Sequence, residues 1–335
     1  MAVFGAGLAL GVALGAPIVV RQEAAVSRAF AQAGSIQAGY SGRLIVGRVD
    51  GLWLLPLDGS APSQIVAIGG GDAISGVSWD PSGTQVAYTR MVLEEGGYLS
   101  ANLHLVDLAG NDRVLVKRDT PGVLLGGPAW AADGDSLLFE VYDLYGGGAR
   151  RIDRVRLDGA GRMVEVVDGM APSLSADGRA LAYLRPEPAG MAIRVRHLAD
   201  GVETEAMAAG AMAGIVIPSL APDGASVVFA ARGTSLAGPD GSGCPLPALP
   251  QGWLDVPAAQ AHGVPSELWR VGSDGLGLAR LTSTQCLDDP AVAWSPDGGW
   301  LAAYGGTSLI LLRADGSAMI PVWAEGSYGG VDWAS

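Results

Sequence analysis

Carboxylates recur immediately ahead of a repeated apolar segment, and they are the residues of this chain best suited to do chemistry. They are Asp72, Asp119, Asp168, Asp288 with Asp289, and Glu325. Carboxylate oxygens that converge on one point concentrate negative potential and favour Ca²⁺, or a cationic peptide or amine. Short solvated loops of an acidic protein also contain Asp without any such role. Both interpretations stay open until the fold places these residues.

Other catalytic constellations are absent from the sequence. There is no G-x-S-x-G nucleophile elbow and no H-E-x-x-H zinc motif. His104 and His197 fall in strand patterns that favour a half-buried structural role, and His262 stands alone. Lys117 is the only lysine, which removes any P-loop and disfavours Schiff-base chemistry. No catalytic residue is therefore predicted, and a hydrolase or lactonase with carboxylates and calcium is the alternative to a non-catalytic protein.

The two cysteines lie in long loops. Cys244 is in an insertion over 232–266, and Cys286 is in the connection after the next hairpin. We expect a disulfide between them, which would hold an insertion with little core of its own, and such a bridge requires an oxidising compartment. Two unrelated buried thiols are the alternative, since no C-x-x-C supports a metal site. The insertion also contains three residues expected to form a lid or contact surface: Trp253, Asp255 and His262.

All these residues are positioned by a repeat of roughly 40–50 residues. Its clearest copy runs from Val292 to Gly298 as V-A-W-S-P-D-G, and a second apolar strand follows from Leu301. Pro presets the backbone for a turn and Gly supplies the positive φ of a tight reversal, so each copy reads as a hairpin. The residue that closes its first strand recurs at 79, 130, 174, 220, 294 and 333.

A second hairpin marker alternates with the first. Asp-Gly stands between apolar segments at 58–59, 158–159, 200–201, 274–275 and 315–316, and Ala-Gly takes this place at 109–110. Two hairpins make four antiparallel strands, here called A to D, which is one blade of a propeller. We expect structural roles for the turn aspartates Asp133, Asp177, Asp223 and Asp297 and for the tryptophans Trp79, Trp130, Trp294 and Trp333.

The two ends of the chain complete one blade. The last repeat stops at Ser335 after its strand A, and the missing strands B and C are supplied near Ile45 and Trp53. Pairing of the N-terminal and C-terminal strands closes the ring and leaves few open sheet edges. The sequence therefore predicts an all-β, six-bladed β-propeller over residues 41–335.

Repeats of the Trp-Ser-Pro-Asp-Gly kind, with an aromatic that closes strand B, resemble the WD-like propeller repeats of the TolB family. Propellers of this style also precede the hydrolase of prolyl-oligopeptidase-type enzymes. The resemblance implies a six-bladed ring and only weakly implies a function, because propellers have many unrelated activities. The chain departs from both patterns: few residues precede the first blade, and we expect no hydrolase domain after the ring.

Composition narrows the class of partner. A chain of 335 residues with 49% hydrophobic residues can bury a large core. Its net charge of −13 provides no basic surface to neutralise phosphates, which argues against nucleic acid.

Residues 1–20 carry no charged side chain and are long enough to cross a bilayer as a helix. Two A-x-A sequences near Phe30 resemble signal cleavage sites, but a charged spacer precedes them, so 1–21 is expected to be an anchor or a signal segment. Residues 22–40 read as a linker. The arginines that follow the apolar segment favour a cytoplasmic location for the rest of the chain. The resemblance and the cysteines favour export instead, and we expect a propeller outside the cytoplasm.

Because successive antiparallel strands run in opposite directions, their connections lie alternately on the two faces of the ring. The A–B and C–D turns are short and lie on one face, while the other face collects the variable loops 91–101, 141–150, 185–190, 232–266, 117–127, 207–216 and 283–290. Variable loops on a rigid scaffold are where binding is usually placed. The sequence thus predicts a non-catalytic propeller that binds a protein, peptide or cell-envelope component through its loop-rich face. No cofactor is predicted, although Ca²⁺ is compatible with the acidic residues. These residues precede strand A, the innermost strand of a blade, so the ligand-binding interpretation places them around the mouth of the central channel.

Overall fold

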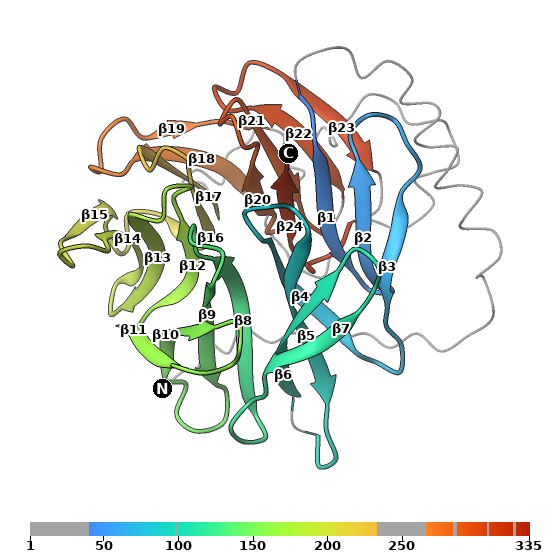
Figure 1. Cartoon of the computed structure of the whole chain (residues 1–335). Helices are drawn as coiled ribbons and strands as arrows, with labels where there is room; N and C mark the ends of the chain where they lie inside the picture. The colour runs from blue at the N-terminus through green and yellow to red at the C-terminus, as the bar shows by residue number, and fades with distance from the viewer. Residues whose placement is uncertain (1–39, 98, 233–265, 284–286, 307, 324–325) are drawn as a thin grey trace.

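The structure is a computed structural model that describes residues 40–97, 99–232, 266–283, 287–306, 308–323 and 326–335. The described residues form six four-stranded antiparallel sheets and contain no helix, which confirms the predicted all-β propeller. The sheets are arranged around a common centre (Figure 1). Within the described residues, no helix has the length and hydropathy needed to span a bilayer. The expected segment 1–21 and nearly all of the linker 22–40 lie outside them.

Each blade runs from an inner strand A to an outer strand D, and the first three blades are as follows. Blade 1 contains β24 (Val331–Ala334), β1 (Arg43–Arg48), β2 (Gly51–Pro56) and β3 (Ser63–Ala67). Blade 2 contains β4 (Ala73–Trp79), β5 (Gln85–Leu93), β6 (Leu99–Asp107) and β7 (Asp112–Val116). Blade 3 contains β8 (Val123–Trp130), β9 (Ser136–Asp143), β10 (Arg150–Arg156) and β11 (Met163–Val167).

The remaining blades repeat this order. Blade 4 contains β12 (Met170–Leu174), β13 (Ala180–Glu187), β14 (Gly190–His197) and β15 (Glu203–Met207). Blade 5 contains β16 (Ala213–Leu220), β17 (Ser226–Arg232), β18 (Glu267–Gly272) and β19 (Ala279–Arg280). Blade 6 contains β20 (Ala291–Trp294), β21 (Trp300–Tyr304), β22 (Leu309–Arg313) and β23 (Met319–Trp323).

Ring closure follows the prediction. The last strand β24 pairs antiparallel with β1, with Leu44 opposite Trp333 and Ile45 opposite Asp332. The indole Nε1 of Trp333 donates to the carbonyl of Ser41 at 2.9 Å, which fixes the two ends of the chain together. In Figure 1 the C-terminus and β24 lie near the centre of the ring, beside β1.

The core lies between the blades rather than within them. Each of six hydrophobic clusters in the described residues joins two neighbouring blades, and the Trp333 cluster joins blade 6 to blade 1. The aromatics that close strand B are fully buried: Tyr88, Phe139, Tyr183, Phe229 and Tyr304. Because each blade must pack on its neighbour to bury these residues, the ring is stable only as a whole.

The C–D turns connect neighbouring blades from the outside. A Cβ added to the turn glycine would meet a carbonyl oxygen of the preceding blade in four cases: Gly110 with Ile65 at 3.1 Å, Gly159 with Leu115 at 3.4 Å, Gly275 with Glu205 at 2.9 Å, and Gly316 with Leu281 at 3.1 Å. All four glycines also have positive φ. The Asp-Gly marker therefore provides a docking point between blades as well as a reversal of the chain.

Candidate functional site

The alternating strands divide the connections between two faces, as expected. The turn face carries the A–B and C–D turns, and the loop face carries the B–C loops and the connections from strand D to the next strand A. The B–C loops differ in length: residues 49–50 link β1 to β2, whereas 144–149 link β9 to β10. The long insertion falls in the β17–β18 loop, and its residues 233–265 lie outside the described part.

Large apolar side chains are exposed on the loop face. Val49 is 76% exposed, Leu93 68%, Tyr145 55% and Tyr328 48%. Each belongs to, or directly adjoins, a B–C loop or a D–A connection. Exposed aromatic and aliphatic residues on a rigid scaffold are typical anchors of a protein interface.

Tyr145 connects blades 2 and 3. Its hydroxyl accepts a hydrogen bond from the backbone N–H of Leu99 at 3.4 Å. Its ring lies against Gly122, where an added Cβ would be 2.4 Å from Cδ2 of the tyrosine. Leu93 is opposite Leu99 in the β5–β6 register, so these residues form a patch at one junction of two blades. We call Leu93, Leu99 and Tyr145 the Tyr145 patch.

A second aromatic position stands between blades 6 and 1. The hydroxyl of Tyr328 donates to Asp288, and partial burial together with this carboxylate raises the pKa of Tyr328. The phenol therefore stays protonated at neutral pH. The adjacent Asp289 accepts from Ser266 at 2.7 Å and lies 3.9 Å from Arg232.

Two of the other predicted carboxylates each pair with a different arginine. Asp72 lies 2.6 Å from Arg90, and Asp119 lies 3.1 Å from Arg162. Asp168 adopts a positive φ of 54°, and its N–H donates to a backbone carbonyl at 3.0 Å. Glu325 is outside the described residues. Among the described residues, no three His, Cys, Asp or Glu side chains are placed to hold a metal ion.

Glu140 is a largely buried carboxylate, 15% exposed, that the sequence pattern did not single out. It lies in β9, accepts from Arg150 at 2.9 Å, and accepts from the N–H of Ala171 at 3.2 Å. Ala171 has a φ of 51° at a bulge of β12, so Glu140 satisfies the N–H of a strained residue in the next blade. Burial outweighs the attraction of Arg150 and raises the pKa of Glu140. The available signal was a charge in the middle of β9, between the apolar residues Phe139 and Val141.

The inner strands of blades 1 to 4 approach each other closely at small residues. A Cβ on Gly330 would lie 3.2 Å from Cα of Gly76, and one on Gly76 would lie 3.3 Å from the N of Gly127. A Cβ on Gly127 would in turn lie 3.8 Å from Cα of Ala171. These contacts bring blades 1 to 4 together backbone to backbone.

The repeat residues have the structural roles expected of them. The turn aspartates Asp133, Asp177, Asp223 and Asp297 each accept the N–H two residues further on, at 2.8–3.0 Å. Trp79, Trp130 and Trp333 are buried, and the indole of the partly buried Trp294 donates to the carbonyl of Ser219 at 3.1 Å.

The histidines show one buried and one exposed position. His104 is buried and lies 3.1 Å from Asp112. His197 is more exposed than expected, and it lies 2.9 Å from Asp200 in its own turn.

Six of the residues singled out from sequence cannot be placed. The cysteines Cys244 and Cys286 and the insertion residues Trp253, Asp255 and His262 lie outside the described residues, as does Glu325. The disulfide and the lid therefore stay predictions.

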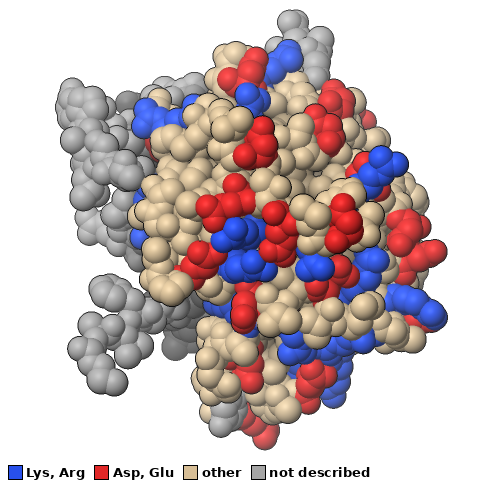
Figure 2. Space-filling view, turned by 90° about the vertical axis from the view of Figure 1, so that its left-hand side faces the viewer, with Lys and Arg blue, Asp and Glu red and all other residues tan. Residues whose placement is uncertain are grey.

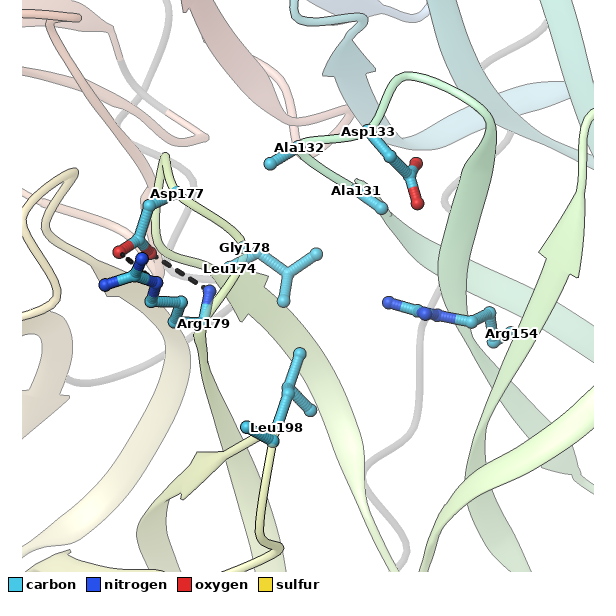
Figure 3. Close-up of a pocket in the computed structure, with 10 residues that line it drawn as sticks. Ala131, Ala132, Asp133, Arg154, Leu174, Asp177, Gly178, Arg179 and Leu198 are labelled. Atoms are coloured by element: carbon cyan, nitrogen blue, oxygen red, sulfur yellow. Dashed lines mark hydrogen bonds and ion pairs between the residues drawn. The ribbon is translucent and has the colours of Figure 1, made fainter.

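The described structure contains a hollow on the turn face, between blades 3 and 4 (Figure 3). Its volume is about 360 Å³. Blade 3 contributes Asp133 and Arg154, whose guanidinium points into the space, and blade 4 contributes Leu174 and Leu198. On the far side, Arg179 lies 3.6 Å from Asp177. The loop pattern of the sequence favours the other face, and no motif in the sequence indicates this hollow.

Basic and acidic side chains are interleaved on the outside of blades 3 and 4 (Figure 2). Asp153 is 2% exposed and lies 2.8 Å from both Arg151 and Arg162. Arg194 lies 2.6 Å from Glu187 and 2.8 Å from Glu205. This side of the molecule is therefore largely neutralised by pairs, in spite of the net charge of −13.

Solved propellers resemble this chain in fold. TolB from Acinetobacter baumannii aligns with a TM-score of 0.62 and 18% identity over 96% of this chain and 74% of that chain. A chain of a nidogen/laminin complex aligns with a TM-score of 0.58 and 15% identity over 88% of this chain and 98% of that chain. The tricorn protease aligns with a TM-score of 0.59 and 14% identity over 86% of this chain but only 27% of the protease.

No family model matches the chain, and the search of curated proteins returned no match. At these identities the likeness shows a TolB-like propeller fold alone. The same fold occurs in a protease chain and in a protein–protein complex, so it does not decide the function.

Proposed function

We propose that this protein is a non-catalytic binding or scaffold propeller that recognises a protein or peptide partner of the cell envelope through its loop face. The observation that carries the proposal is the exposure of Val49, Leu93, Tyr145 and Tyr328 on that face. Tyr145 is held by Gly122 and Leu99, so it is presented in a fixed position that costs little conformational entropy on binding.

Two further observations support recognition of a protein rather than of a small substrate. The loop face is built on a closed ring whose blades are joined by interlocking cores. A chain of the same fold occurs in a nidogen/laminin complex, which shows that such a ring can be part of a protein–protein complex. The proposed place outside the cytoplasm is supported by the apolar N-terminal segment and by the expected disulfide.

The test is site-specific photo-crosslinking in the native cells. A benzoylphenylalanine replaces Tyr145 or Tyr328 on the loop face, and Val202 or Leu276 on the turn face as matched exposed positions. The proposal predicts a discrete protein adduct from the loop-face positions and none from the turn-face positions. Adducts from the turn-face positions alone, or from no position, would contradict it.

The alternative, a calcium-dependent hydrolase or lactonase, has no supporting geometry among the described residues. It predicts a calcium-dependent rise in melting temperature, because a ligand that binds only the native state stabilises it. The binding proposal predicts the same melting temperature with calcium and with a chelator. A calcium-dependent rise that Asp288→Asn abolishes would favour the enzyme.

A further inference from the structure

The Arg154 guanidinium differs from the other arginines of β10. Arg150, Arg151 and Arg156 each donate a hydrogen bond to a carboxylate. Arg154 makes no such bond, its nearest carboxylate is that of Glu165 at 3.8 Å, and its Nε is buried without a hydrogen-bond partner. A guanidinium cannot lose its charge, so each buried donor without an acceptor costs free energy.

The space in front of Arg154 is the hollow between blades 3 and 4 (Figure 3). Leu174 and Leu198 form an apolar wall opposite the guanidinium. A volume of about 360 Å³ suits a small ligand or one terminal residue of a peptide, and not a folded domain.

The acidic residues of the hollow already have partners within their own turns. Asp177 accepts from Ser175 at 2.7 Å and from the N–H of Arg179 at 3.0 Å, and these bonds lower the pKa of its carboxyl. Asp133 accepts from the N–H of Asp135 at 2.8 Å and is exposed to solvent, which screens its charge. Arg179 is exposed and lies 3.6 Å from Asp177 of its own turn. Arg154 is thus the lining group that has a buried donor without a hydrogen-bond partner.

We propose that this hollow binds a carboxylate that carries an aliphatic group, with the carboxylate on Arg154 and the aliphatic group on Leu174 and Leu198. The planar guanidinium matches a carboxylate in a bidentate arrangement, and such charge-assisted bonds are among the strongest in proteins. The carboxylate comes either from a free acid or from the C-terminal residue of a peptide. This site is on the turn face, so it is independent of the partner surface proposed above.

The experiment is an NMR titration of the full chain with N-acetyl-leucine, followed at the backbone amides of Ala132 and Gly178. The proposal predicts saturable shifts at millimolar ligand and at least a roughly tenfold weaker response to N-acetyl-leucinamide, which lacks the negative charge. A short peptide ending in leucine and the same peptide amidated at its C-terminus distinguish the peptide source from the free acid. Tighter binding of the free peptide than of N-acetyl-leucine assigns the peptide source, and the reverse order assigns the free acid.

Variants on the same strand provide the control. Arg154→Gln is expected to weaken binding at least about tenfold, and Arg154→Lys to give an intermediate loss because it keeps the charge but not the fork. Arg156→Gln alters an exposed arginine that pairs with Asp158, and it should change binding less than about twofold. Retained dispersion of the amide spectrum shows that each variant is folded. Absence of saturable shifts, equal binding of the amide, or unchanged binding to folded Arg154→Gln would overturn the proposal.

Discussion

Asp332 provides a pH-dependent test of the sheet that closes the ring. It lies in β24, opposite Ile45 of β1, and its carboxylate accepts from the N–H of Trp79 at 2.7 Å and from its neighbour Trp333 at 2.8 Å. Burial outweighs these bonds and raises the pKa of Asp332 to about 6, compared with an ordinary value of 3.8. Between pH 3.8 and about pH 6, the native state therefore holds a proton that the unfolded state has released.

The sign of the effect follows from this difference in proton binding. Because the pKa of Asp332 is higher in the folded state, protonation of this carboxyl adds to the free energy of unfolding. This contribution is complete below pH 3.8 and is lost as the pH rises through about 6. At about 1.36 kcal/mol per pKa unit, the loss is at most roughly 3 kcal/mol. The Asn side chain of the Asp332→Asn variant is uncharged at every pH. The variant loses one carboxylate oxygen as a hydrogen-bond acceptor, and this loss does not depend on pH. The unfolding free energy of the variant, relative to wild type, should therefore rise by up to roughly 3 kcal/mol between acidic and neutral pH.

The assay is urea unfolding of both proteins by tryptophan fluorescence, from about pH 4 to pH 7. Asp297→Asn is the control, because bonds from Ser295 and Gly299 lower the pKa of Asp297, and its contribution is lost only as the pH falls below its ordinary range. The difference in unfolding free energy between Asp297→Asn and wild type should therefore change little between about pH 4 and pH 7. If the unfolding free energy of Asp332→Asn relative to wild type does not change with pH, or falls as the pH rises, burial does not raise the pKa of this carboxyl.

Two further predictions concern packing between and within blades. Asp153→Asn should lower the free energy of unfolding by about 3 kcal/mol, because it leaves two arginines facing each other around a side chain that is 2% exposed. Asp158→Asn alters an exposed pair and should lower it far less, so equal urea midpoints of the two variants would contradict this. Gly275→Ala should lower the melting temperature more than Gly59→Ala, because both have positive φ but only the former Cβ meets a carbonyl, that of Glu205 at 2.9 Å. Equal shifts would show that the close approach is not important.

The fold could be predicted because its determinants are local and repeated. The residue that closes strand A recurs in every blade, and an Asp-Gly turn recurs in every blade except blade 2, where it is Ala109-Gly110. Both mark short hairpins whose geometry depends on Pro, Asp and Gly. Ring closure followed from the missing strands at the two ends of the chain, and the pairing of Leu44 with Trp333 confirms it. The same alternation correctly divided the loops between two faces.

The candidate sites were less accessible to sequence analysis because they depend on contacts between blades. Glu140 and Asp332 are important through the backbone N–H groups that they meet in the neighbouring blade, and no spacing along the chain encodes those contacts. Arg154 looks in sequence like the other arginines of β10, and only the structure shows that it lacks a close acceptor. The expected acidic group was a reasonable inference from position, but Asp72 and Asp119 each lie beside a different arginine.

The most direct test of the account is the effect of loop-face substitutions on the partner captured by photo-crosslinking. The loop-face variant Tyr145→Ala/Tyr328→Ala is compared with the turn-face variant Val202→Ala/Leu276→Ala, all four residues being about half exposed or more. The account predicts that the loop-face variant weakens the affinity for that partner by at least about tenfold, as expected for aromatic anchors, and that the turn-face variant leaves it unchanged. Equal affinities of the two folded variants, or a loss confined to the turn-face variant, would contradict recognition through the loop face.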